Sequence, residues 1–171
     1  MAINDVWSTR GDQVGSLLRP ERLLAARDKF NAGQMAAAAL RTLEDESIRE
    51  VVRMQEAAGL RIVTDGEYRR FSYSDSFTAS GVTGVDLRET EPEGWSKSAK
   101  FGSRTARLIP AVVDRLQWAG GDNARDFAFL RSVTSQTAKV TLPGPGYIHY
   151  RAGRANISRS VYPDLDGFWS D

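Results

Sequence analysis

Apolar residues recur every three or four positions along two stretches of the amino-terminal half, which is the spacing of one helix face. The first stretch begins with Pro20 at an expected first helical position and ends at Gly33. The second and longest covers residues 35–58, where acids separate the apolar positions. Asp45 and Arg49, four positions apart, indicate a solvated surface with modest pairing rather than a site. Two amphipathic helices are therefore predicted.

Short apolar and β-branched runs predict strands between and after these helices. Residues 62–63 follow the long helix directly and are expected to form a buried strand. Val14 is expected to end a first short strand, and residues 108–118 to form a third. Residues 139–142 are the predicted fourth, which the Pro-Gly-Pro-Gly of residues 143–146 breaks.

The remaining segments complete an alternating order of strands and helices. Residues 71–107 have no strong period and are expected to form a long functional loop. A helix is predicted from about residue 123 to 135, and another amphipathic segment begins near residue 162. This order is typical of a parallel α/β sheet. A full (β/α)8 TIM barrel needs about 250 residues, so we expect residues 1–171 to be a single incomplete TIM-barrel domain, about the first half.

Composition narrows the class of protein. The chain has 171 residues, 41% hydrophobic and 26% charged, which suffices for one ordinary core. Its 23 basic and 22 acidic residues nearly cancel, so neither nucleic acid nor an anionic membrane is an expected partner. No apolar run approaches the roughly 20 residues of a membrane span, and residues 1–12 lack the apolar core of a signal peptide. A soluble cytoplasmic protein is predicted.

Candidate ligand-binding residues follow the predicted strands, because α/β folds bind ligands at the carboxyl ends of parallel strands. Gly15 permits close backbone approach, and Ser16 offers a hydroxyl and an N–H group. Glu67, after the strand at residues 62–63, is predicted to be a ligand-binding carboxylate. The alternative is that Asp65 or Glu67 only caps the next segment or pairs with Arg69 or Arg70.

Metal-binding side chains are scarce in the sequence. There is no cysteine, and His149 is the only histidine, so these residue types cannot complete a metal site. A single histidine close to two tyrosines is more often packed or hydrogen-bonded than catalytic. We therefore predict no metal site and assign no catalytic residue.

Four stretches carry a family resemblance when taken together. They are Val-Gly-Ser at residues 14–16, Thr-Asp-Gly-Glu-Tyr-Arg-Arg at 64–70, Phe-Gly-Ser-Arg at 101–104 and Lys-Val-Thr-Leu-Pro-Gly-Pro at 139–145. In order and approximate spacing the chain resembles the cobalamin-independent methionine synthase family, in its shorter single-barrel branch. The resemblance implies transfer of a methyl group from methyltetrahydrofolate to the thiolate of homocysteine, which a zinc ion activates, to make methionine.

The resemblance also implies roles for individual residues. Those implied to bind homocysteine or methionine are Val14, Gly15, Ser16 and Glu67, with Glu67 on the ammonium group. Arg104 and Thr105 are implied to lie where the folate binds. A zwitterionic amino acid needs a carboxylate for its ammonium group and backbone N–H groups for its carboxylate, so the chemistry of these residues fits.

The sequence differs from the family in its metal-binding residues. The family's zinc ligands, which are histidine, cysteines and a glutamate, belong to the second half of the barrel, and Gln13 stands where many relatives have histidine. We expect an amino-terminal half, from a truncated gene, a split enzyme or an incomplete gene model. Its expected partners are small-molecule substrates and either a complementary carboxyl-terminal half or a second copy of the chain.

Two other functions are compatible with the sequence. One is an enzyme of the same barrel superfamily that transfers an alkyl group to another thiol or decarboxylates a porphyrin. The other is a non-catalytic binding or remnant protein, because the metal ligands of the family are missing.

Overall fold

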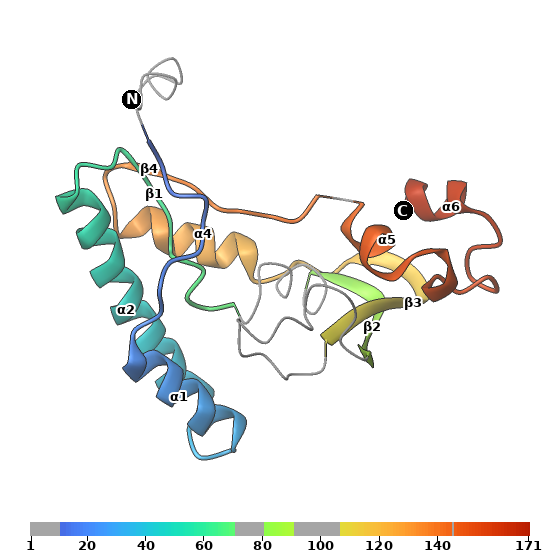
Figure 1. The fold of residues 1–171 in the computed structure, drawn as a ribbon, viewed down its shortest axis with the longest axis horizontal. Coiled ribbons are helices and arrows are strands. Elements are labelled where there is room, and N and C mark those ends of the chain that lie inside the picture. The colour runs from blue at the N-terminus through green and yellow to red at the C-terminus, as the bar shows by residue number, and fades with distance from the viewer. Residues whose placement is uncertain (1–10, 71–80, 91–106, 145) are drawn as a thin grey trace. The chain divides into compact units, whose positions relative to one another are not determined.

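Two compact units make up the protein in this computed structural model, which describes residues 11–70, 81–90, 107–144 and 146–171 (Figure 1). The first unit comprises Met1–Tyr73 and Asn123–Leu142, and the second comprises Ser74–Asp122 and Pro143–Asp171. Each unit contains both helices and strands, so the predicted mixed α/β class is confirmed.

The helices of the first unit follow the predicted amphipathic stretches. Helix α1 covers Glu21–Asn31 and packs against α2, which covers Ala37–Ala57. Pro20 precedes α1 with an extended backbone, and its carbonyl accepts the N–H of Leu23 at 2.9 Å. The helix therefore begins one residue later than predicted, because Pro20 supplies the first carbonyl of the helix rather than its first helical residue.

The core of the first unit lies between these helices and the short strand β1 (Ile62–Val63). Its buried members are Leu23, Ile48, Val51, Val52, Val63, Tyr68 and Leu130. Burying each large aliphatic side chain stabilises the fold by about 1.5–3 kcal/mol. The apolar spacing that predicted the two helices is thus the spacing of the side chains that hold them together.

The parallel pairing of the first unit joins β1 to β4 (Thr137–Ala138), with Ile62 opposite Thr137. Helix α4 (Asn123–Ser132) precedes β4. The predicted strand at residues 62–63 is confirmed. The predicted strand at 139–142 is wrong in its bounds, because only Lys139 N continues the pairing, to Val63 O at 2.9 Å.

No strand occurs in residues 11–20, so the predicted strand ending at Val14 is wrong. The backbone there is held by the turn after β1 instead of by a ladder. Leu17 N donates to Gly66 O at 3.1 Å, and the Thr64 hydroxyl donates to Gly15 O at 2.8 Å. Single contacts of this kind place a loop without forming a strand.

The second unit contains an antiparallel hairpin of β2 (Val82–Thr90) and β3 (Arg107–Trp118). The strand predicted at residues 108–118 is confirmed, but its antiparallel pairing differs from the predicted parallel sheet. The predicted loop is also wrong over Val82–Thr90. Gly84, with φ 83°, interrupts the alternation of β2, and the register shifts between Thr83 and Val85, which hides the strand pattern in the sequence.

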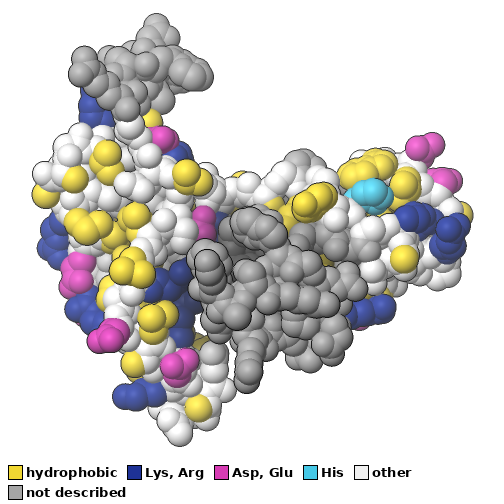
Figure 2. All heavy atoms as spheres, in the orientation of Figure 1, with side chains coloured by type: hydrophobic (Ala, Val, Ile, Leu, Met, Phe, Trp, Pro, Cys, Tyr) yellow, Lys and Arg dark blue, Asp and Glu magenta, His cyan; other side chains and the backbone are white. Residues whose placement is uncertain are grey.

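Three short helices complete the second unit: α5 (Tyr147–Ala152), η4 (Arg154–Asn156) and α6 (Leu165–Ser170). Its buried core is Val112, Ile148, Ile157, Tyr162 and Phe168. The His149 ring lies 5.3 Å from the ring of Trp169, and hydrophobic side chains lie next to the histidine on the face shown in Figure 2. This is the packing role that the sequence favoured.

Among the described strands, parallel pairing joins only β1 and β4; a single parallel bridge also links Val112 to Ile157. The described residues form no complete barrel. The half-barrel and the single domain over residues 1–171 stay predictions. None of the helices described is both long and apolar enough to cross a membrane.

Adjacent leucines in α1 give a matched test of this core. Leu23 is 0% exposed and Leu24 is 47% exposed. Leu23→Ala is expected to lower the free energy of unfolding by about 2–5 kcal/mol, because it leaves a cavity in the core. Leu24→Ala is expected to cost less than about 1 kcal/mol. Urea denaturation measures both, and equal losses would contradict the described packing.

Candidate functional site

The turn that follows β1 is polar and yet buried. Thr64, Asp65, Glu67 and Arg70 are all among the buried polar residues of the chain. Buried polar groups need hydrogen-bond partners, since leaving one unpaired costs about 1–3 kcal/mol. The hydrogen bonds of this turn therefore show which of its polar groups are already paired within the protein.

The backbone of the turn passes through the left-handed region at two consecutive residues. Gly66 has φ 68°, which glycine tolerates, and Glu67 has φ 57°, which is unfavourable for a residue with a side chain. Asp65 Oδ1 accepts the N–H of Glu67 at 2.9 Å, and Thr64 Oγ1 accepts the N–H of Gly66 at 3.2 Å. These bonds hold a conformation that the chain would otherwise avoid.

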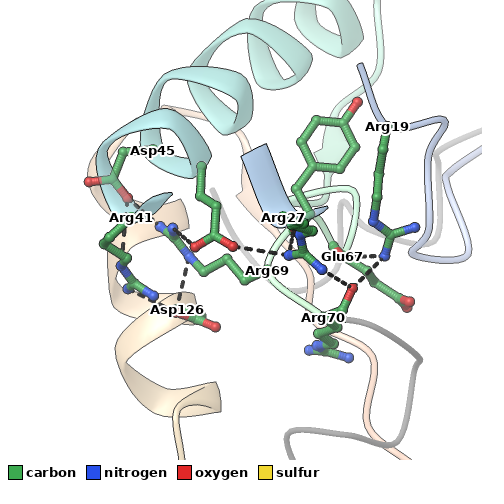
Figure 3. A network of polar contacts seen from close by, with 10 residues as sticks. Arg19, Arg27, Arg41, Asp45, Glu67, Arg69, Arg70 and Asp126 are labelled. Atoms are coloured by element: carbon green, nitrogen blue, oxygen red, sulfur yellow. Dashed lines mark hydrogen bonds and ion pairs between the residues drawn. The ribbon is translucent and has the colours of Figure 1, made fainter. Parts of the chain in front are cut away.

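Two arginines bind the carbonyl groups on the other side of the turn (Figure 3). Arg19 Nη2 donates to Glu67 O and to Arg70 O, both at 2.8 Å. Arg27, from α1, donates to Arg70 O at 2.9 Å and also to Tyr68 O. The start of the chain and its first helix therefore fix the backbone on which Glu67 sits.

Acidic residues of α2 and α4 hold the same region through Arg27 and Arg69. Glu44 lies 3.0 Å from Arg27, and Arg69 lies 2.7 Å from Asp45 and 3.1 Å from Asp126. The prediction that the charges of α2 form only a solvated surface is therefore wrong. Burial raises the pKa of the Glu44 carboxyl, and the positive charge of Arg27 and Arg69 opposes this shift.

The Glu67 carboxylate lies beside Gly15 and Thr141. Thr141 Oγ1 donates to Glu67 Oε1 at 2.6 Å. A Cβ added at Gly15 would lie 2.6 Å from Glu67 Oε1 and 2.8 Å from Thr141 Oγ1, so only glycine fits there without movement. Two of the predicted ligand-binding residues, Gly15 and Glu67, are thus in direct proximity.

The other predicted site residues are placed differently. Ser16 follows Gly15 and is exposed, whereas the Val14 side chain is 86% exposed and away from the core. Arg104 and Thr105 lie outside the described residues. The alternative role of Asp65 as a cap is confirmed, because its Oδ1 accepts the N–H of Glu67. Pairing of Glu67 with Arg69 or Arg70 is not among the described contacts, in which its carboxylate accepts from Thr141. The binding roles themselves stay predictions.

Sequence reasoning missed Arg19, Arg27 and Thr141. Arg27 carried a usable signal, since no acidic residue stands three or four positions from it along α1 and its partners therefore had to lie elsewhere. Thr141 carried none, because a threonine near a strand end is ordinary.

The residues described do not fit a zinc ion. No group of three or more histidine, aspartate or glutamate side chains in the described part of the chain could hold a metal, and the sequence contains no cysteine.

Comparisons with known proteins agree with the resemblance found in the sequence. Uncharacterized protein YxjH of Bacillus subtilis is 31% identical over 164 residues, which are 95% of this chain and 41% of that protein. A 5-methyltetrahydropteroyltriglutamate–homocysteine methyltransferase of Thermotoga petrophila is 27% identical over 142 residues, covering 81% of this chain and 18% of that protein. No family model matches the chain.

Solved structures give the same result. A protein of Listeria monocytogenes assigned as a vitamin-B12-independent methionine synthase matches with a TM-score of 0.72 and 30% identity over 95% of this chain. The chain is a homologue of cobalamin-independent methionine synthases. It spans 44% of the Listeria protein. A B12-independent methionine synthase of Shewanella sp. W3-18-1, solved in complex with selenomethionine, matches with a TM-score of 0.54 and 26% identity over 69% of this chain and 33% of that protein.

The tight approach of Gly15 to Glu67 is testable in this methionine synthase homologue. Gly15→Ala is expected to lower the free energy of unfolding by about 1–3 kcal/mol, because the new methyl group displaces Glu67 or Thr141. Gly11→Ala is the matched control, since no atom lies within 4 Å of a Cβ added at Gly11. Chemical denaturation measures the stability of both variants. A Gly15→Ala protein as stable as the control would show that Gly15 does not lie this close to Glu67.

The buried Asp65 carboxyl predicts a pH effect. Burial raises its pKa above that of the unfolded chain, so its contribution to stability is largest at acidic pH and is lost as pH rises through the folded-state pKa. Asp65→Asn keeps an acceptor for the Glu67 N–H but cannot titrate. Stability is measured for both proteins between about pH 3.5 and 7.5. The stability of wild type relative to Asp65→Asn should fall with rising pH, and a constant or rising difference would contradict the assignment.

Proposed function

We propose that the chain binds an amino acid of the homocysteine or methionine type, with the ammonium group of the ligand on the Glu67 carboxylate. The observation that carries this proposal is the position of Glu67. The residue is 7% exposed, and its carboxylate accepts a hydrogen bond from Thr141 and is closely approached by the backbone at Gly15. A buried carboxylate held in this way forms strong charge-assisted hydrogen bonds with a cation.

The geometry of the turn favours binding over a purely structural role. The described hydrogen bond of the carboxylate involves Oε1, so Oε2 is the atom we assign to the ligand ammonium group. The backbone of Glu67 is already fixed by Arg19 and Asp65. A carboxylate positioned before the ligand arrives loses little entropy on binding, which raises affinity.

The relatives support the same class of ligand. The Shewanella protein is a B12-independent methionine synthase in complex with selenomethionine, and the Thermotoga protein is named for methyl transfer to homocysteine. We therefore propose that the amino acid bound here takes part in methyl transfer from a methyltetrahydrofolate to homocysteine, with Arg104 and Thr105 at the folate. Val14, Gly15 and Ser16 are the proposed backbone contacts of the amino acid.

We assign no residue of this chain to activation of the homocysteine thiol. Its sequence contains no cysteine and a single histidine, and the described residues form no metal site. We propose that the activating group is bound by residues supplied from elsewhere, in a complementary carboxyl-terminal half of the barrel.

Replacing the carboxylate tests the proposed function. Glu67→Gln is expected to weaken L-methionine binding by about 1.5–3 kcal/mol, the value of a hydrogen bond to a charged group. Isothermal titration calorimetry measures the affinity, and circular dichroism verifies the fold. Glu46→Gln, an exposed glutamate of α2 in the same unit, is the matched control. Unchanged affinity in folded Glu67→Gln would refute the assignment.

A further inference from the structure

The Arg70 guanidinium is buried with one nitrogen unpaired. Arg70 is 3% exposed, and its Nη1 donates to Thr141 O at 2.7 Å. Its Nη2 is buried and has no hydrogen-bond partner among the residues that the structure describes. A buried charged donor without a partner is costly, and one in a native protein requires an explanation such as a ligand or an ion.

Holding Thr141 in place explains only one of the hydrogen-bond donors of the Arg70 guanidinium. The bond from Nη1 to Thr141 O tethers the segment after β4, and a lysine ammonium or a neutral amide is able to make such a single bond. A guanidinium offers further donors in one plane, in the geometry that binds carboxylates bidentately. The unpaired Nη2 is therefore the part of the side chain that tethering does not explain.

Opposite charges lie on the two sides of Thr141. Its hydroxyl donates to the Glu67 carboxylate at 2.6 Å, and its carbonyl accepts from the Arg70 guanidinium at 2.7 Å. The carboxylate and the guanidinium are thus both bonded to Thr141. They carry the charges that would pair with the ammonium and carboxylate groups of a zwitterion.

We infer that Arg70 binds the carboxylate of the amino acid whose ammonium group binds Glu67, and that this pair selects α-amino acids over simple amines. The inference rests on the proposed function. Nη2 donates to one carboxylate oxygen, and the second oxygen is free for the backbone N–H of Ser16. Because both charged residues are buried, the ligand charges leave water on binding, and a ligand that lacks either charge leaves a buried group unpaired.

The test changes the ligand and the protein together. Calorimetry compares L-methionine with 3-(methylthio)propylamine, which keeps the ammonium group and the thioether but lacks the carboxylate. Wild type is expected to bind L-methionine about 10- to 100-fold more tightly than the amine. Arg70→Gln is expected to lose this preference by weakening L-methionine binding while its affinity for the amine stays within about twofold. Arg70→Lys, which keeps the charge and a donor, is expected to retain part of the preference.

Each outcome separates this inference from the proposed function. Arg53→Gln, an exposed arginine of α2, is the control and should keep the full preference. If Arg70→Gln weakens both ligands equally, or neither, Arg70 only tethers Thr141 and the inference is overturned while the role of Glu67 stands. Wild type that binds both ligands equally overturns it without any variant, even if Arg70→Gln does not fold. Wild type that binds neither ligand overturns the proposed function as well.

Discussion

The first unit depends on one constraint, which is the left-handed turn at Gly66 and Glu67 directly after a buried strand. That turn directs backbone carbonyl groups into the protein, where each must find a donor. Arg19 and Arg27 supply those donors, through Glu67 O, Tyr68 O and Arg70 O. The positions of α1 and of the turn are therefore set by the same hydrogen bonds.

The acidic residues around the turn follow from the buried arginines. A buried guanidinium needs nearby negative charge, because an unpaired buried charge is strongly destabilising. Glu44 pairs with Arg27, and Asp45 and Asp126 pair with Arg69. The Arg69 guanidinium also stacks over Phe129, with its central carbon 4.7 Å from the ring centroid. These contacts support the turn, while the Glu67 carboxylate itself accepts a hydrogen bond from Thr141.

The sequence predicted the elements whose formation depends on residues close together along the chain. The apolar spacing of α1 and α2 and the β-branched pair Ile62–Val63 predicted elements that the structure contains. The hairpin was missed because Gly84 interrupts the alternation of β2, and the pairing of β3 depends on a partner distant in sequence. Glu67 was predicted from its place after a strand. Its support by Arg19 and Arg27 was not, since those contacts join residues more than 40 positions apart.

The central claim is that this supported turn presents Glu67 to the ammonium group of an amino acid. The most direct measurement is a crystal structure of the chain soaked with L-selenomethionine, in which the anomalous signal of selenium locates the ligand. The account predicts a single ligand whose nitrogen lies within hydrogen-bond distance, about 2.7–3.2 Å, of the Glu67 carboxylate. Selenium bound elsewhere, with the Glu67 carboxylate contacting only Thr141, would contradict it.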